Sequence, residues 1–472
     1  MSCSDLGKAT IVGVWAKAET TCGTFEMPAA TDVILPTGFP AVNQEFPTTD
    51  GMEISNSLDI TEQFQSAAQP VSFTIPMYTR TPIAASLGTA IQGDVLFQSL
   101  LGSAVAATTV GIEPSATWTV ALTELPFDTL TGGWMPDMGV VIGATSAEQI
   151  FYRGITWTSA VAGTLNNCER GYMGTTAIIA EQAIGTAVTL TSRFYRQDND
   201  SPPFSMVVQM DHTVFYVTGC AVNSATLGVT NESGMAWNFD GQGLSFEWAG
   251  KCTLAVDASI TQKNVVVPDA KLYSVGAFIE NVTKNKDDTD GYEIDAINYG
   301  TDTLTLEKNI DVQWDAGDVI QGFTPASTSL AYTIENRYTD VYVDNTATTI
   351  QNTDLNISCP KQFITDEVGS TYPTAFVEDK RSITGTFSLY ARATDVKYIY
   401  ENTQRTEVKT HFLFGETEGQ RMGISMRRTK LTNPTLSGNG PTMNMSLTLT
   451  ALGEVNSTTS EVGENSIEIV TM

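Results

Sequence analysis

Apolar and polar side chains alternate most regularly near the end of the chain, in the stretch 381–453. Its last part alternates small polar residues with Met443, Met445, Leu447, Leu449 and Ala451. A period of two places one face of a strand in a core and the other face outside it. The pattern therefore predicts a strand whose outer face is small, hydroxylic and uncharged.

A second strand and a helix are predicted just before it. Apolar residues alternate with Thr and Ser in the segment SITGTFSLY, and Thr394 or Asp395 then offers a helix cap. Val396, Ile399 and Tyr400 follow at the spacing of one helix face. The predicted order of elements is thus strand, helix, strand, turn and strand.

The same order of elements occurs earlier in the chain. Segments with matching alternation align in pairs: SFTIPMYTR (72–80) with TGTFSLYAR (384–392), SLDI (57–60) with DLNI (354–357), the predicted helix DVLFQSLLG with DVKYIYEN, and Met235, Trp237 and Phe239 with Met443, Met445 and Leu447. Identity is low, so the order and phase of the elements carry the alignment. We infer an internal duplication.

A second repeat lies between these two copies, at 138–190 and 275–321. Each copy has short strand candidates separated by Gly, Asn or Asp turns, which is typical of a small all-β barrel or sandwich. The sequence therefore predicts a mainly β chain with two tandem sandwich or barrel units, each with a short helix, and two small inserted β units. The predicted bounds are core unit one at 8–131 and 194–257, β unit one at 132–193, β unit two at 258–325 and core unit two at 326–472.

Charge is the most unusual feature of the composition. The 472 residues include 53 acidic and 25 basic side chains, a net charge of −28. Such a balance argues against binding to nucleic acid phosphates or to an anionic membrane, because both would be repelled. No apolar run is long enough to cross a bilayer, and MSCSDLGKAT lacks the basic and apolar regions of a secretory signal. We expect no membrane segment and no leader.

Candidate chemistry is sparse along the chain. The six cysteines are scattered without a CxxC pair and are expected to be free thiols in a reducing compartment. The acidic segment 287–291 fails the calcium-loop pattern, because Ile297 stands where the bidentate Glu should be. His212 and His411 have no metal-site spacing, so a structural role is expected for both. Neither GxSxG nor a phosphate loop occurs. We expect no catalytic residue, no cofactor and no metal.

Several segments together resemble the major tail tube proteins of long-tailed, non-contractile bacteriophages. They are GVWAKAETTCGT (13–24) with LPTGFP (35–40), WAG (248–250), FGETEGQRMGISM (414–426) and MNMSLTLTALGE (443–454). The resemblance covers nearly the whole chain and implies a structural virion protein of the duplicated-core type. Three such chains would form a ring that imitates sixfold symmetry, and stacked rings would form the tail tube.

The resemblance also implies partners and a location. The chain would bind copies of itself in the ring and between rings, together with tape measure, tail terminator and distal tail proteins. Double-stranded DNA would pass through the lumen without specific binding during ejection into the host. The protein would occur in the virion tail, and in the host cytoplasm during assembly. The small β units would lie on the outside of the tube.

Physical reasoning names candidate residues for this role. A wall that DNA slides past needs few Lys or Arg contacts, because each phosphate contact strengthens binding. The candidate lumen residues are Ser72, Thr74, Thr384, Thr386, Ser388, Asn444, Ser446, Thr448 and Thr450. The alternative is that some of these strands face solvent or a packed helix.

Contacts between rings are expected from two loops in equivalent places of the repeat, 19–51 and 359–380, the first of which contains Phe39 and Phe46. Arg427 and Arg428 are candidates for contact with an acidic patch on the next ring. The alternative, which the sequence supports at least as well, is that they lie on a solvated strand face. The alternative function is a multi-domain β adhesin or carbohydrate-binding surface protein. The missing secretion signal and membrane segment argue against it.

Overall fold

The computed structural model of the chain describes residues 12–50, 63–81, 87–453 and 466–472, apart from gaps at 103, 106–109, 120, 133–134, 144–147, 176–184, 196–200, 231–232, 285–289, 328–331, 418 and 440–441. The predicted mainly β class is confirmed. Strands dominate the described ranges, which contain two α-helices, α1 (Asp94–Leu101) and α2 (Lys397–Gln404). The predicted helix DVLFQSLL coincides with α1.

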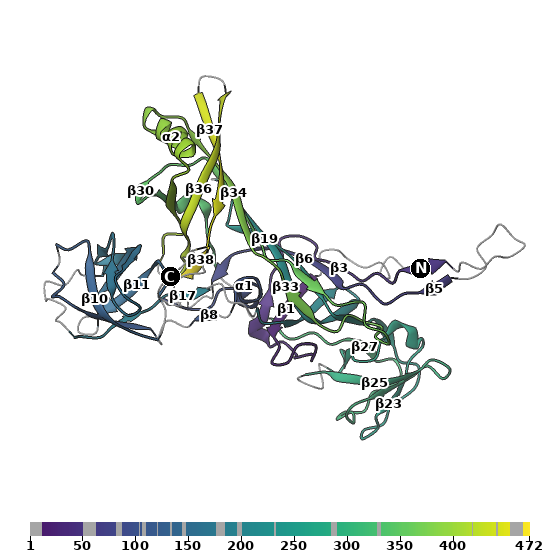
Figure 1. Cartoon of the computed structure of the whole chain (residues 1–472). Helices are drawn as coiled ribbons and strands as arrows, with labels where there is room; N and C mark the ends of the chain where they lie inside the picture. Colours follow the sequence, from purple (N-terminus) through teal and green to yellow (C-terminus); the bar gives the residue numbers. More distant parts are fainter. Residues whose placement is uncertain are drawn as a thin grey trace, which may run out of the picture.

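Eight strands from both halves of the chain pair side by side into one antiparallel sheet, which we call the long sheet (Figure 1). Across it lie β3 (Ala41–Asn43), β6 (Val71–Tyr78), β20 (Ala236–Gly243), β19 (Thr213–Thr230), β31 (Asn352–Ser358), β34 (Ser382–Tyr390), β37 (Thr442–Ala451) and β36 (Met422–Asn439). The first four belong to core unit one and the last four to core unit two. The pairing of β19 with β31 therefore joins the two copies.

The two 18-residue strands, β19 and β36, each bend from the long sheet into a second layer. The first part of β19 pairs with β18 (Phe204–Met210) and β21 (Ser245–Ala249), and its last part with β20 and β31. The first part of β36 likewise pairs with β35 (Glu407–Phe414) and β38 (Glu468–Thr471). β1 (Val12–Ala18) and β29 (Thr339–Val343) complete the two second layers. Each core unit is thus a sandwich with one strand common to both layers.

One hydrophobic core fills both sandwiches without a break. Phe97 of α1 lies inside it, with its ring 5.3 Å from the Trp237 ring and 5.1 Å from the Phe239 ring. The predicted apolar stripe of the second helix is wrong in part, because Tyr398 is buried and Tyr400 is 66% exposed. A 3-10 turn over Ala393–Val396 precedes α2 and shifts its phase.

The strand registers agree with the internal duplication. In core unit one, Trp237 pairs with Met77. In core unit two, the aligned residues Met445 and Leu389 pair with each other. The repeat extends to two hairpins, β4 (Thr48–Asp50) with β5 (Gln63–Gln65), and β32 (Lys361–Phe363) with β33 (Phe376–Glu378). Each has three residue pairs and lies in the same connection of its copy. The predicted match of 57–60 with 354–357 is wrong, because β3 takes the place of β31 in core unit one: Asn43 pairs with Ser72 as Asn356 pairs with Thr384. Residues 57–60 themselves lie outside the described residues.

β unit one is an eight-stranded sheet with its own core around Trp118 and Tyr152. Its strands are β13 (Ile155–Trp157), β14 (Gly163–Leu165), β10 (Leu125–Thr131), β9 (Gly111–Pro114), β16 (Val188–Leu190), β11 (Met138–Gly143), β12 (Gln149–Arg153) and β15 (Glu169–Arg170). The unit therefore starts near residue 111, not 132 as expected. The correction follows from pairing, because β10 bonds to β14 and β9 bonds to β16.

β unit two is a six-stranded sheet that packs on the second layer of core unit one. Its strands are β22 (Lys251–Thr253), β27 (Val319–Gly322), β24 (Phe278–Asn281), β25 (Tyr292–Asn298), β26 (Thr303–Leu306) and β23 (Asn264–Val266). It begins at 251 instead of 258, because β22 pairs with β27. Tyr216 Oη lies 2.6 Å from Phe278 O and 2.8 Å from Phe323 O, which fixes the unit to β19. The two β units lie at opposite ends of the molecule (Figure 1).

The remaining described strands are short. They are β2 (Val33–Ile34), β7 (Arg80–Thr81), β8 (Ala104–Val105), β17 (Arg193–Tyr195), β28 (Tyr332–Thr333) and β30 (Thr346–Ala347). Of these, β17 extends the second layer of core unit two by pairing with β38. It thereby ties the end of β unit one to core unit two.

The shared core predicts a large effect of cavity formation. Phe239→Ala should lower the free energy of unfolding by about 3–5 kcal/mol, since Phe239 is fully buried beside Phe97 and Trp237. Asn238→Ala, one residue away on the opposite face, should change it by less than about 0.5 kcal/mol. Denaturant titration of both variants measures the difference. Equal effects would contradict the assignment of faces.

Candidate assembly surface

The face of the long sheet that points away from the core carries rows of small polar side chains. One row runs through seven strands and consists of Pro76, Asn238, Thr226, Asn356, Thr384, Thr450 and Lys430. None of these residues is buried. Because every second residue of each strand points to this side, the alternation in the sequence produces a continuous face, which we call the polar face.

All nine candidate lumen residues lie on the polar face, and none of them is buried. Three cross-strand pairs bring six of them together, namely Thr384 with Thr450, Thr386 with Thr448 and Ser388 with Ser446. Asn444 pairs with Tyr390, and Ser72 and Thr74 lie on β6. The nine residues therefore share one face of the long sheet, which spans both copies.

Sequence reasoning missed the central part of this face. Thr226 of β19 and Asn356 of β31 pair directly across the junction between the copies. Their signal was the alternation in SATLGVT and TDLNIS. The face is not free of charge, since it also carries Asp240, whose Oδ1 accepts a hydrogen bond from Thr74 Oγ1 at 2.7 Å.

Both lateral edges of the long sheet are open. Among the described strands, neither the outer edge of β3 nor that of β36 over residues 432–439 has a pairing partner. At the aligned place inside the chain, β19 pairs with β31. An open edge leaves N–H and C=O groups ready to pair with another strand.

Apolar side chains are exposed on β36 at its open edge and on the adjoining end of β37. Leu436 is 49% exposed, whereas the aligned Leu227 is 2% exposed. Met443 is 55% exposed, whereas the aligned Met235 is fully buried. The alignment follows from the pairs Leu227–Trp237 and Leu436–Met445. The same position in the fold is thus covered in core unit one and uncovered in core unit two.

The two repeated hairpins differ in the same way. The β32–β33 hairpin packs on core unit one, where Phe363 joins Ala221 and Leu244 in a small buried cluster. The expectation that 359–380 bridges rings is corrected to this extent, because its strands make a contact within the chain. The β4–β5 hairpin is exposed at all six strand positions and projects from the body (Figure 1).

The candidate ring-contact residues fall into two groups. Phe39 is 56% and Phe46 41% exposed, both beside β3, and the Phe46 ring touches the Tyr372 ring at 6.4 Å. Arg428 pairs with Glu407, with Nε 2.8 Å from Oε2, so it already has a partner in the chain. These positions leave Phe39 and Phe46 as the accessible candidates.

Arg427 is buried, so its assignment to a surface contact was wrong. Its Nη2 lies 3.1 Å from Glu468 Oε1, and its Nε lies 3.7 Å from Asp137 Oδ1. Glu468 Oε2 also accepts a hydrogen bond from Asp137 N at 2.7 Å. The carboxylates come from β38 and from β unit one, which is why the sequence around Arg427 did not reveal them. This ion cluster fastens β unit one to core unit two.

His411 is fully buried beside the same cluster, with Nε2 4.0 Å from Asp137 Oδ2. Burial lowers the pKa of His411 to about 4, against the opposing attraction of Asp137. Lys409, Arg153 and Arg427 add to the lowering by repulsion. The imidazole is therefore neutral at physiological pH, in line with the structural role that the sequence suggested.

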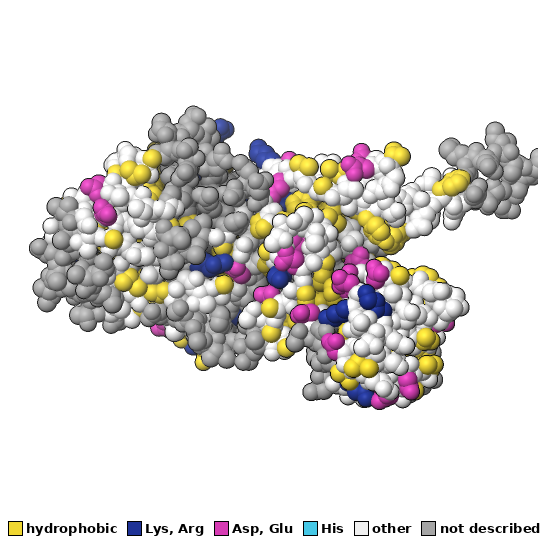
Figure 2. All heavy atoms as spheres, turned by 90° about the horizontal axis from the view of Figure 1, so that it is seen from below, with side chains coloured by type: hydrophobic (Ala, Val, Ile, Leu, Met, Phe, Trp, Pro, Cys, Tyr) yellow, Lys and Arg dark blue, Asp and Glu magenta, His cyan; other side chains and the backbone are white. Residues whose placement is uncertain are grey.

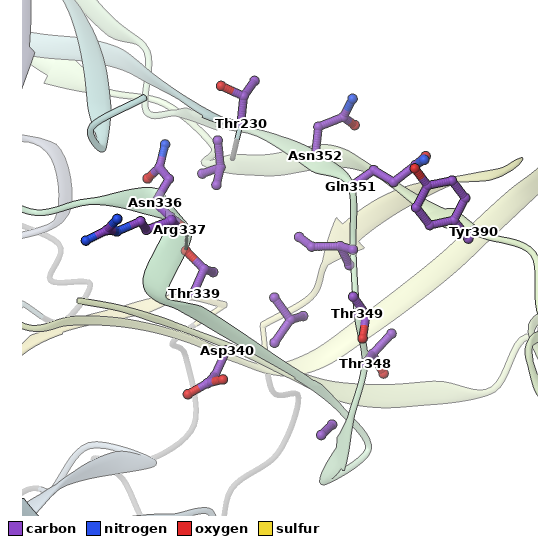
Figure 3. A pocket seen from close by; sticks show the side chains of 14 residues that line it. Thr230, Asn336, Arg337, Thr339, Asp340, Thr348, Thr349, Gln351, Asn352 and Tyr390 are labelled. Atoms are coloured by element: carbon purple, nitrogen blue, oxygen red, sulfur yellow. Dashed lines mark hydrogen bonds between the residues drawn. The ribbon is translucent and has the colours of Figure 1, made fainter. Parts of the chain in front are cut away.

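A pocket of about 510 Å³ opens at the end of the β19–β31 junction (Figure 3). Thr230 and Asn352 pair at its rim, and Arg337 and Asp340 supply the charged groups. The Arg337 side chain is 60% exposed and pairs with Glu335 at 2.8 Å. The described lining contains no His, Cys, Lys or Ser.

Charged side chains on the face shown in Figure 2 are interspersed, with Asp and Glu beside Lys and Arg. Within the described ranges, no group of three or more His, Cys, Asp or Glu side chains is placed to hold a metal ion. No described helix combines the length and the apolar character needed to span a bilayer.

No protein-family model matches the chain, and no curated protein matches its sequence.

His411 predicts a specific dependence of stability on pH. Its pKa is lower in the folded chain than in the unfolded chain, so folding disfavours the charged form. Stability is full above about pH 6.5 and falls as the pH drops toward 4, by about 3 kcal/mol. In His411→Gln this part of the slope should vanish. Denaturant titration at several pH values measures it, with His212→Gln as the matched control that keeps the slope.

Proposed function

We propose that this chain is a structural protein that assembles with copies of itself into closed rings, and that stacked rings form the tube of a bacteriophage tail. Three chains, and thus six core units, would surround a central channel. The polar face of the long sheet would line the channel. The protein would act by shape and self-association, without catalysis.

The observation that carries this proposal is the unequal burial of aligned residues in the two core units. Leu227 and Met235 are covered by the other half of the same chain, whereas Leu436 and Met443 stand exposed beside an unpaired strand edge. Burying an apolar side chain stabilises by about 1.5–3 kcal/mol. Soluble proteins seldom leave a long apolar edge open, because it pairs with other chains. A second copy supplies the cover that core unit one already has.

The geometry of the edges favours a closed ring over a dimer. One open edge belongs to β3 in core unit one and the other to β36 in core unit two. Joining unlike edges is a head-to-tail contact, which generates a ring when the rotation closes and a filament when it does not. A sheet closed on itself has no edges left. The repeated β19–β31 junction would supply the same rotation at every step.

The polar face suits a channel for DNA. Its rows consist mainly of Thr, Ser and Asn side chains, with Asp240, Asp354 and Lys430 among them. The chain has a net charge of −28, so a duplex passing through would be repelled rather than held. Few cationic groups on the wall keep the number of phosphate contacts low. DNA would therefore move without specific binding.

Assembly is tested by size exclusion and negative-stain imaging of the purified chain. The expected result is rings or tubes that become more abundant on concentration. A double variant, Leu436→Asp with Met443→Asp, should reduce assembly by roughly tenfold or more, because charges replace the apolar edge. Val312→Asp is the matched control, since Val312 is 41% exposed on β unit two. Stable monomers at every concentration would refute the proposal.

A further inference from the structure

The chain contains a finished junction between its two copies, and this junction can serve as a template. Its first part is the pairing of β19 with β31, in which Thr226 faces Asn356 and Gly228 faces Asp354. Its second part is the β32–β33 hairpin, which lies on core unit one beside Ala221. Both parts have aligned counterparts that lack a partner in the described chain, namely β36 with β3, and the β4–β5 hairpin.

We infer that β36 pairs with β3 of a second copy in the register of the internal junction, and that the β4–β5 hairpin of that second copy docks laterally on core unit two. The inference rests on the proposed function, because it names the contact through which the ring would close. The occupant of the open edge is thus another copy of this chain. The hairpin contacts a neighbour in the same ring rather than in the next ring.

The register follows from aligned pairs. Thr226 pairs with Asn238 and Thr435 with Ser446, and Asn238 aligns with Ser446, so Thr435 takes the place of Thr226. On the other side of the junction, Asn356 pairs with Thr384. Asn43 pairs with Ser72, the residue aligned with Thr384. Asn43 therefore takes the place of Asn356. In the joined sheet, Thr435 would face Asn43 of the second copy.

The neighbouring pairs on the core side support this register. Leu227 faces Leu355 in the internal junction, where both are buried. The aligned pair is Leu436 with Val42, of which Leu436 is 49% exposed and Val42 is half-buried. The register therefore places an apolar pair where the template has one. A slip by one residue would set Leu436 opposite a β3 residue whose side chain points to the polar face.

The landing site of the hairpin is also open in core unit two. Ala221 is fully buried beneath Phe363 of the β32–β33 hairpin. Ala221 pairs with Gln242 and the aligned Lys430 pairs with Thr450, so both occupy the same place in the sheet. The Lys430 side chain is 37% exposed, with its nearest acid, Glu407, at 3.8 Å. The site covered in one copy is accessible in the other.

The aligned side chains are complementary in charge. Phe363 holds the third position of β32, and Asp50 holds the third position of β4. An apolar contact of Phe363 with Ala221 within the chain thus corresponds to a contact of Asp50 with Lys430 between chains. Asp50 is exposed on the projecting hairpin and bonded only locally, accepting from Gln63 Nε2 at 2.9 Å. The opposite charges of Asp50 and Lys430 would attract each other at the surface, and salt would weaken this attraction.

Disulfide trapping tests the register in the full-length chain. Asn43→Cys with Thr435→Cys should link neighbouring molecules, and mass spectrometry should identify the linked peptide. Thr226→Cys with Asn356→Cys is the matched control, because the same geometry then links one chain to itself. Gln44→Cys with Thr435→Cys is the negative control, because the two side chains point to opposite faces of the sheet and should not link. Cys22, which is exposed, is replaced by Ser throughout.

The expected result is an intermolecular link several-fold more abundant for the Asn43 pair than for the Gln44 pair. Rings that carry no link, or a link only in the Gln44 pair, would overturn the register and leave the proposed function intact. Chains that neither link nor form rings would refute the inference and the proposed function together.

A charge swap tests the hairpin contact separately. Asp50→Lys and Lys430→Asp should each weaken assembly, on the order of fivefold per junction. The double variant should restore it. Asp366→Lys, an exposed reversal on the other hairpin, is the control and should leave assembly unchanged. Rings that form equally well in both single variants would overturn the lateral docking of the hairpin.

Discussion

Backbone pairing between β19 and β31 is the interaction on which the rest of the structure depends. It joins the two copies into one sheet and buries Leu227 and Leu355 at the same time. Each copy has two different sheet edges, and the β19–β31 pairing uses one edge of each copy. The long sheet therefore ends in two different edges, one on β3 and one on β36. The proposed ring follows from the pairing of these two edges between molecules.

The bent strands β19 and β36 transmit this constraint to the rest of the molecule. Each contributes to both layers of its sandwich, so the direction of the junction is set by the packed core. The β units attach to the second layers, one through the buried Arg427 cluster and one through Tyr216. Neither occupies the polar face or the open edges of the long sheet in the described chain. Breaking such a buried ion cluster leaves an uncompensated charge, so this attachment is costly to separate.

Much of the fold could be predicted from the sequence, because alternation and repetition are local signals. They predicted the strands around Thr74 and Thr386, their common face and the helix α1. The start of β unit one was wrong because strand alternation in β9 and β10 does not show which sheet they join. Arg427 was misassigned because its partners, Asp137 and Glu468, are distant in the sequence. The open edges could not be predicted, since an edge is defined by a strand that is missing.

Carrying both copies on one polypeptide has a consequence for how an assembly would grow. Every second junction around a closed ring would already exist when the chain has folded, held at an effective concentration that no dilution changes. Only the alternate junctions would depend on encounter between molecules. The internal junction contains an apolar contact of Phe363 with Ala221, whereas the proposed external junction would place Asp50 beside Lys430 at the same position, so salt would weaken only the contacts between molecules.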